Sequence, residues 1–367
     1  MYYHLPIEVH LDVLKCLSFN QLFSAKQVNR YFLSFIGKYE GELARKFFKH
    51  MGLIELKGFY YQHKKENGQL DYKILDLKEL GRYVVHSPMD NELLEMKWQF
   101  AIARQLCLYE YPGFLDRLEF RCYLHLTDES RHLLLQLPTF PKNIEQLQII
   151  RLWLLQLFNC SFEEVCFTFA TFNHQMIKLL FYNDKTISTK FLTKRAMIYD
   201  CVPGLENIFK NNLTIFESLK IQPSWAVEDY RDLLPLFFNK IPYVSYDHDA
   251  RPTLCNLILD HIENSTDCQI NVDKTEFHYQ NWPLFTLSER AINVERKRVD
   301  RFNYVKYELS NIHNPNIKFL IQWIYTEIAI NEHAQNLGIL QAYLAIERMK
   351  GQNIESLLEY DLNKLFF

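Results

Sequence analysis

The sequence predicts an α/β protein, in which a small N-terminal unit of three helices precedes a curved stack of helix–strand units, and a hairpin and further helices follow. Two patterns lead to this expectation. Apolar residues recur at helical spacing within residues 1–40, and farther along the chain a helical segment followed by a short strand-like segment recurs. A content of 48% hydrophobic residues in 367 indicates a globular protein with a large core. A compact single α/β domain is the alternative.

Three short helices are expected near the N-terminus. In the first, Val9, Val13 and Leu17 lie four residues apart and form one apolar face. Asn20 and Asn29 are suited to cap a second and a third helix, because their side chains can accept hydrogen bonds from free backbone N–H groups. The third helix carries a wide apolar stripe made of Tyr31, Phe32, Phe35, Ile36 and Tyr39. Such a small unit buries too little surface to be stable alone, so it needs a partner.

The same segment resembles the F-box motif over about residues 4–45. That motif opens with Leu-Pro-x-Glu-Leu, continues with an apolar pair and a closing Leu, and later has a Val-x-Arg-x-aromatic segment. The matching residues are Leu5-Pro6-Ile7-Glu8-Val9, Asp12-Val13-Leu14, Leu17, Leu22, Val28-Asn29-Arg30-Tyr31-Phe32 and Ile36. Val9 stands where the family usually has Leu, and Tyr31-Phe32 stand where many members carry Trp.

This resemblance implies docking on the Skp adaptor of a cullin-RING (SCF) ubiquitin ligase and, through the adaptor, on cullin. By match of position, the residues that would contact the adaptor are Leu5, Pro6, Val9, Leu17, Leu22 and Val28, with Glu8 near the edge. Residues 1–50 hold seven Lys/Arg and four Asp/Glu, a net +3 in a chain of net −3, which suits an acidic adaptor. The alternative is that these helices only cap the core of a larger domain.

The expected helical module occupies residues 1–48, and the remainder of the chain is expected to form three regions. Residues 49–90 would be a connector with a possible hairpin around residues 66–68, residues 91–330 an α/β domain that recruits substrate, and residues 331–367 C-terminal helices. Helices are predicted at residues 91–109 and from a cap at Asn143 to Phe158, and a strand follows at 165–169.

Three further units repeat the order of helix and strand. Helices at residues 205–213, 227–239 and 254–263 lead to strands at 219–221, 243–246 and 269–272. The pitch of about 25 to 35 residues matches a degenerate leucine-rich-like α/β array. A hairpin is predicted at residues 304–311 and 317–323, and helices at 337–349 and 354–365.

An N-terminal F-box before a long degenerate α/β region is similar to the large F-box families expanded in nematodes, and Ser310-Asn311-Ile312-His313-Asn314-Pro315 resembles segments of that group. This similarity implies that the C-terminal region recruits a protein substrate, whose identity the sequence does not indicate. The strand aromatics Phe167, Tyr243 and Tyr246 are candidates for the recognition face. Packing in the core is the favoured interpretation for them.

The sequence predicts no catalytic role, no cofactor and no metal site. It has no glycine-rich phosphate loop, no G-x-S-x-G, no H-E-x-x-H and no C-x-x-C. Packing is the ordinary role for Cys160 and Cys166, and Asp247-His248-Asp249 is expected to be a solvated loop. The basic residues Arg296, Lys297, Arg298 and Arg301 are expected in a solvated turn, with a nucleic-acid patch as the lesser alternative.

The expected location is the cytoplasm, the nucleus or both. The first residues lack the basic start and apolar core of a signal peptide, and no stretch has the ~18 uninterrupted apolar residues of a membrane helix. The eight cysteines are therefore expected to be reduced. Neither a membrane nor a nucleic acid is an expected partner. Two functions remain open, a substrate receptor of an SCF ligase and a non-degradative scaffold that binds the adaptor.

Overall fold

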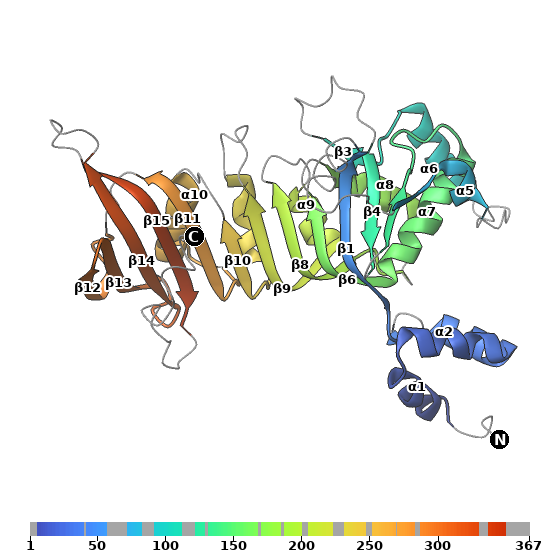
Figure 1. Ribbon diagram of the computed structural model, residues 1–367, viewed down its shortest axis with the longest axis horizontal. Helices are drawn as coiled ribbons and strands as arrows, with labels where there is room; N and C mark the ends of the chain where they lie inside the picture. Colours follow the sequence, from blue (N-terminus) through green and yellow to red (C-terminus); the bar gives the residue numbers. More distant parts are fainter. Residues whose placement is uncertain are drawn as a thin grey trace. The chain divides into compact units, whose positions relative to one another are not determined.

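The computed structural model describes residues 6–349, apart from residues 40–41, 57–71, 83–91, 112–121, 129–130, 168–169, 185–186, 200–204, 223–230, 247–251, 269, 283–286 and 330–336. The chain divides into two compact units. Unit 1 comprises Met1–Cys166, Ala170–Lys194 and Asn211–Thr214, and unit 2 comprises Phe167–Phe169, Arg195–Lys210 and Ile215–Phe367. The protein is of the mixed α/β class with a large mixed sheet, which confirms the predicted class (Figure 1).

Up to residue 200 the chain contains both helices and strands. The helices are α1 (Ile7–Lys15), α2 (Phe19–Val28), α3 (Arg30–Lys38), α5 (Leu77–Gly81), α6 (Glu92–Ala103), α7 (Ile144–Phe158) and α8 (His174–Leu180). The strands are β1 (Lys46–Glu55), β2 (Tyr72–Leu75), β3 (Tyr109–Glu110), β4 (Cys122–Thr127), β5 (His132–Leu135), β6 (Cys160–Phe167), β7 (Thr171–Phe172) and β8 (Phe191–Tyr199).

The later elements are mostly strands. The helices are α9 (Leu205–Asn211), the 3-10 helix η4 (Arg231–Phe238) and α10 (Pro252–Asn264). The strands are β9 (Leu213–Gln222), β10 (Tyr243–Tyr246), β11 (Lys274–Trp282), β12 (Ile292–Val299), β13 (Phe302–Ser310), β14 (Lys318–Ala329) and β15 (Leu337–Arg348).

In unit 1 the strand order runs β6-β1-β4-β5-β2. β1 and β4 are antiparallel, with Leu53 opposite Leu124, and β4 and β5 are also antiparallel. β2 joins β5 in parallel. The central strand β4 is buried along most of its length, which places the core of unit 1 against it. β3 and β7 form a separate two-stranded antiparallel sheet.

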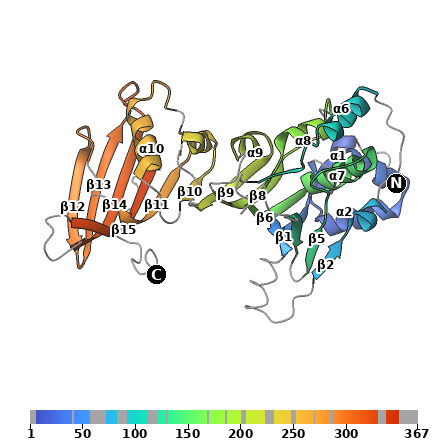
Figure 2. The ribbon, with the colours of Figure 1, turned by 90° about the horizontal axis from the view of Figure 1, so that it is seen from above.

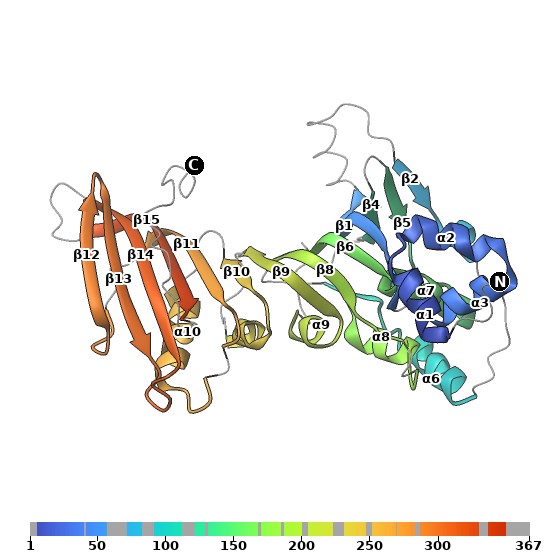
Figure 3. The same ribbon diagram turned by 90° about the horizontal axis from the view of Figure 1, so that it is seen from below.

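In unit 2 the strand order runs β12-β13-β14-β15-β11-β10-β9. β9, β10 and β11 are parallel neighbours, whereas β11 and β15, β15 and β14, β14 and β13, and β13 and β12 pair antiparallel. α10 lies on one face of these strands (Figures 2 and 3). It contributes the buried side chains of Leu254, Ile258 and Ile262, while β14 contributes buried Phe319 and Ile321.

Several predicted elements are confirmed. The three N-terminal helices are present, and α7 begins after Asn143, whose side chain accepts a hydrogen bond from the N–H of Gln146 at 2.9 Å. α6 forms within the predicted range but ends at Ala103, before the expected residue 109. The hairpin of β13 and β14 is antiparallel, with Tyr307 opposite Ile321.

Other predictions are wrong. Residues 337–348, which were expected to be helical, form β15, because β11 and β14 pair with this segment on both sides. The strand expected at residues 269–272 begins only at Lys274. Residues 292–299 form a strand rather than a turn. β2 pairs with β5 in parallel. The loop of the hairpin that was expected around residues 66–68 lies outside the described residues. The same holds for Phe169, Asp247-His248-Asp249 and the helix expected at 354–365.

Candidate functional site

The α1–α3 segment, called the N-terminal module below, starts from local capping. Pro6 is the N-cap residue of α1, and its carbonyl accepts hydrogen bonds from the N–H groups of Val9 and His10 at 3.1 and 3.2 Å. Glu8 lies in the first turn and Lys15 in the last turn, where their charges interact favourably with the helix dipole. The predicted first helix is therefore present, but it ends at Lys15, before the predicted Leu17.

The second helix begins two residues earlier than predicted. Ser18, not Asn20, is its N-cap, and Ser18 and Gln21 form a reciprocal capping box. The third helix follows the prediction, because the Asn29 side chain accepts a hydrogen bond from the N–H of Phe32 at 2.9 Å. Since Asn29 is also the C-cap of α2, one extended residue separates the two helices and folds them against each other.

The N-terminal module has a small core of its own. The buried members are Leu14, Leu22, Phe35, Ile36 and Leu43, and the partly buried ones packed against them are Leu11, Leu17, Ala25, Tyr31, Phe32 and Tyr39. His10 is buried as well, with its Nδ1 2.6 Å from the hydroxyl oxygen of Tyr31. The aromatic stripe predicted on the third helix therefore mostly packs inward.

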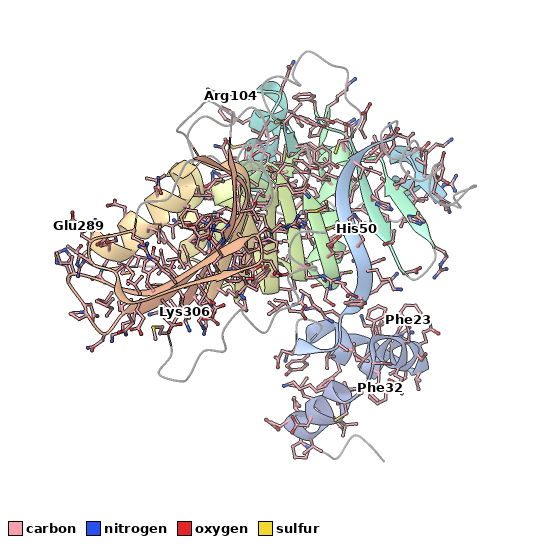
Figure 4. The ribbon with its side chains drawn as sticks, turned by 60° about the vertical axis from the view of Figure 1, so that its left-hand side comes forward. Phe23, Phe32, His50, Arg104, Glu289 and Lys306 are labelled. Carbon is pink, nitrogen blue, oxygen red and sulfur yellow. The ribbon has the colours of Figure 1, made fainter. Side chains whose placement is uncertain are left out.

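The same module leaves large apolar side chains on its surface. Their exposed fractions lie between 40% and 70%, and they are Ile7, Val9, Val13, Phe23, Val28 and Leu33. Figure 4 labels Phe23 on α2 and Phe32 on α3. Since the core is already filled by other side chains of these helices, this exposure is not needed for folding, and it makes these residues candidates for an interaction surface.

The predicted contact residues lie in different environments. Pro6, Glu8, Val9 and Val28 are exposed, and Val28 is the most exposed apolar side chain among them at 70%. Leu17 is partly buried against the core of the module, and Leu22 is buried with 3% exposure. Leu5 lies outside the described residues. Leu22 thus belongs to the core of the module and not to its surface. Val13, Phe23 and Leu33 are exposed on the module but are absent from the predicted set of contact residues.

A hydrogen bond links the end of the module to the rest of unit 1. The guanidinium group of Arg45 donates to the carbonyl oxygen of Phe158, the last residue of α7. A cavity of about 200 Å³ lies nearby, between α2, α3 and the segment around Asn159. Among the exposed apolar residues of the module, Phe23 alone lines this cavity within the described part of the chain. The other exposed side chains do not face it.

Three histidines line up on β1, β4 and β5 in unit 1. His125 Nε2 and His132 Nδ1 are 2.9 Å apart with ring planes at 6°, and the His50 ring lies 5.2 Å from that of His125. Figure 4 labels His50. The 2.9 Å contact fits a hydrogen bond in which one ring donates its N–H to the other. Within the described residues, no group of three His, Cys, Asp or Glu side chains is arranged to hold a metal ion.

The described cysteines are all free thiols. Cys160 and Cys166, at the two ends of β6, are buried, and burial raises the pKa of Cys166 to about 12. A thiol with such a pKa is a poor nucleophile and a poor ligand. The low exposure of both thiols places them in the core.

Unit 2 contains a buried charged network that the sequence did not suggest. Glu276 lies on β11 with its Oε1 2.9 Å from Lys274 Nζ, and Tyr243 donates its hydroxyl to Oε2 at 2.5 Å. Lys274 Nζ also lies 3.0 Å from Glu347 Oε1. Desolvation by burial raises the pKa of Glu276, but the polar contacts of His278, Tyr243 and Tyr343 and the charge of Lys274 outweigh it and hold the pKa at about 2.

The charged state of Glu276 is expected to stabilise unit 2 in a pH-dependent way. Because its pKa falls from 4.5 to about 2 on folding, the contribution is present above about pH 4.5 and is lost as the pH falls toward 2. Glu276→Gln should lower the free energy of unfolding by about 2 kcal/mol at neutral pH, and the difference should shrink below about pH 4.5.

Urea denaturation across a pH series measures this effect. The matched control is Glu289→Gln, which changes an exposed carboxylate (Figure 4) and should stay within about 0.5 kcal/mol at every pH. A Glu276→Gln difference that is the same at pH 7 and pH 3 would contradict the assignment.

The strand aromatics proposed for recognition are mostly core residues. Phe167 and Tyr246 are fully buried, and Tyr243 is half-buried with its hydroxyl on Glu276. No described helix is long and apolar enough to cross a membrane.

Comparison with known proteins adds one finding. A domain of unknown function, DUF8381, matches residues 79–224, which is less than half of the chain. The matched range begins in α5 and ends just after β9, so the N-terminal module lies outside it. No curated protein and no solved structure matches the chain. The fold and the candidate site thus define a mixed α/β protein with an N-terminal helical module that exposes apolar side chains.

Proposed function

We propose that this chain is a non-catalytic substrate receptor of an SCF-type ubiquitin ligase, in which the N-terminal module is an F-box that binds the Skp adaptor and, through it, cullin. The observation that carries the proposal is the exposure of Val9, Val13 and Val28 on a module whose core is already complete. These residues belong to the motif that resembles the F-box. An adaptor that covered them would bury apolar area that is otherwise in contact with water.

In this proposal the remainder of the chain recruits a protein substrate. The α9–β9, η4–β10 and α10–β11 segments would be consecutive units of a degenerate leucine-rich-like array, and the parallel pairing of β9, β10 and β11 supports this. Ubiquitin transfer would be helped by proximity alone. A substrate held on the same assembly as a charged conjugating enzyme has a high effective concentration, so this chain needs no catalytic group.

Adaptor docking is tested with a double variant of exposed residues. Val9→Asp/Val28→Asp places two charges on the proposed interface without touching the core of the module, and we expect adaptor binding to weaken about 30-fold or more. The measurement is the affinity of purified full-length chain for purified Skp adaptor, with helicity checked by circular dichroism. Co-purification with cullin is the second readout.

The matched control is Phe140→Asp, which puts a charge on an apolar side chain of unit 1 that is 54% exposed but lies outside the module. It should bind the adaptor as the wild type does. A folded Val9→Asp/Val28→Asp variant with undiminished adaptor affinity would rule out docking through this surface and would leave the module as a cap of unit 1.

A non-degradative scaffold that binds the adaptor is the second candidate, and protein turnover distinguishes the two. If the chain is a receptor, its depletion should raise the abundance of at least one protein that co-purifies with it, and the Val9→Asp/Val28→Asp variant should fail to reverse this rise. Unchanged turnover of every bound protein would favour the scaffold.

A further inference from the structure

β12 forms one edge of the unit 2 strands. It pairs with β13 on one side, and no described strand pairs with its other side (Figure 2). All eight of its residues, Ile292 to Val299, are exposed, so neither face of β12 is covered. In an antiparallel strand, every second residue turns its N–H and C=O away from its neighbour. The outer edge of β12 therefore presents a row of backbone donors and acceptors to the solvent.

The side chains of this edge carry uncompensated positive charge. Three consecutive cations lie opposite neutral residues of β13: Arg296 opposite Val305, Lys297 opposite Tyr304 and Arg298 opposite Asn303. The single acid of β12, Glu295, lies opposite Lys306, which Figure 4 labels. Within the described residues, Arg296, Lys297 and Arg298 make no ion pair and no hydrogen bond through their side chains. The neighbouring strand thus places a cation opposite the single acid and no acid opposite the three cations.

The unpaired edge of β12 and its positive charge together determine which kind of segment could bind there. A segment that pairs with the outer edge must be extended and must have free backbone N–H groups. Because side chains alternate along a strand, Arg296 and Arg298 would meet one face of the added strand and Lys297 the other. Acidic residues opposite these cations would form favourable cross-strand pairs.

Two other occupants fit less well. A second copy of β12 in antiparallel pairing would bring Arg and Lys side chains opposite one another, which is destabilising. Single-stranded nucleic acid is usually held by stacking on aromatic side chains, and β12 has none. Nucleic acid would also leave the backbone groups of the edge unpaired.

We propose that β12 is a docking edge for an extended acidic segment of a partner protein, which adds to the sheet as an outer strand next to β12. For the receptor proposed above, this names the class of substrate segment that unit 2 captures. Only that link to ubiquitin transfer rests on the proposed function. Capture of the segment itself requires neither the adaptor nor the N-terminal module.

The test uses the full-length chain and three fluorescent peptides of about ten residues. In the first, glutamate and valine alternate, in the second lysine and valine alternate, and in the third glutamate and proline alternate. The third has the charge of the first but lacks the N–H of every second residue, and its prolines fix φ at about −65°, away from the φ of about −140° of an antiparallel strand. We expect the glutamate–valine peptide to bind at least about tenfold more tightly than either of the others, and to bind more weakly as the salt concentration rises.

Reversing the charge tests the residues. In Arg296→Glu/Lys297→Glu/Arg298→Glu the preference should switch from the glutamate–valine to the lysine–valine peptide. The control Lys210→Glu changes an exposed cation at the end of α9 and should leave the preference unchanged. Hydrogen exchange provides an independent readout, because the outward amides of residues 292–299 should exchange more slowly when the glutamate–valine peptide is bound.

Several results would overturn the proposal. Equal affinity for the glutamate–proline peptide would mean charge attraction without strand pairing. Tighter binding of an oligothymidine that is lost in the charge-reversed variant would assign the edge to nucleic acid. No binding of the first peptide, together with self-association of Arg296→Gln/Lys297→Gln/Arg298→Gln, would show that the cations only protect an exposed edge. Each of these leaves the adaptor-binding assay of the Val9→Asp/Val28→Asp variant unaffected, so failure here and failure of the proposed function are distinguishable.

Discussion

Replacing Phe167 with alanine is expected to lower the free energy of unfolding by about 3 to 5 kcal/mol. Phe167 is the last residue of β6 and has no exposed surface. Its ring fills space inside the protein, and a protein interior packed at crystal-like density closes only partly around a deleted ring. The loss thus combines the lost burial of the ring with the cost of the cavity left behind. Chemical denaturation measures it.

The matched control is Phe216→Ala on β9, where the ring is 55% exposed. This substitution should change the free energy of unfolding by no more than about 0.5 kcal/mol. The comparison also decides between the two interpretations of the strand aromatics. If Phe167→Ala left stability unchanged while it weakened the capture of a partner, Phe167 would be a recognition residue and its assignment to the core would be wrong.

Replacing Asn311 with alanine is expected to cost about 3 kcal/mol. Asn311 follows β13 and is 1% exposed. Its Nδ2 donates to the carbonyl oxygens of Ile262 and Ser265, both at 2.8 Å, at the end of α10. Its Oδ1 accepts from the N–H groups of His313 and Asn314 at 2.9 and 2.8 Å.

One side chain thus satisfies two carbonyls that the end of a helix leaves free and two N–H groups of the β13–β14 turn. Without it these backbone groups lose their partners in the protein. Asn314→Ala is the control in the same turn. The Asn314 side chain is exposed and accepts one hydrogen bond, from Asn316 N at 3.3 Å, so its removal should cost less than about 1 kcal/mol.

Hydrogen exchange locates the effect of Asn311→Ala. Amides at the end of α10 and in the turn should exchange faster, while those of β4 in unit 1 should be unchanged. Equal stability of Asn311→Ala and Asn314→Ala would contradict the assigned role. The Ser310–Pro315 stretch thus has a structural reason to contain asparagine at position 311.

The sequence predicted well where an element depends on residues close in the chain. α3 and α7 begin where Asn29 and Asn143 cap them, since a cap needs only the N–H groups of the next turn. The β13–β14 hairpin was predicted from two strand-like segments around a turn, and both strands are present. Even the error at the start of α2 is local, because Ser18 and Gln21 form a better cap than the predicted Asn20.

The prediction failed where pairing with distant segments decides the structure. The pattern of residues 337–349 is compatible with a helix, yet β15 pairs with β11, which is more than fifty residues away in the sequence, and with β14. Strand neighbours on both sides satisfy the backbone and override a weak local preference. The basic residues 296–298 were predicted in a turn for the same reason, because a short polar segment becomes a strand only when β13 lies beside it.

In the candidate site, too, the local sequence predicted the helix but not which side chains are exposed. The spacing of Val9, Val13 and Leu17 predicted the first helix of the N-terminal module, because a helical apolar face is a property of residues close in the chain. The sequence did not separate Leu22, which is 3% exposed, from Val28, which is 70% exposed. Both are apolar, and only the packing of α2 against α3 determines which of them is covered.

Short-range chemistry in the chain therefore accounts for where most helices begin, for the hairpin and for the apolar module at the N-terminus. Long-range packing accounts for β15, for the buried network around Glu276 and for the position of β12 at a sheet edge. The physical reason is that a cap or a turn is stabilised within one or two turns of backbone. A buried charge or an unpaired strand edge exists only in relation to segments that folding brings from elsewhere in the sequence.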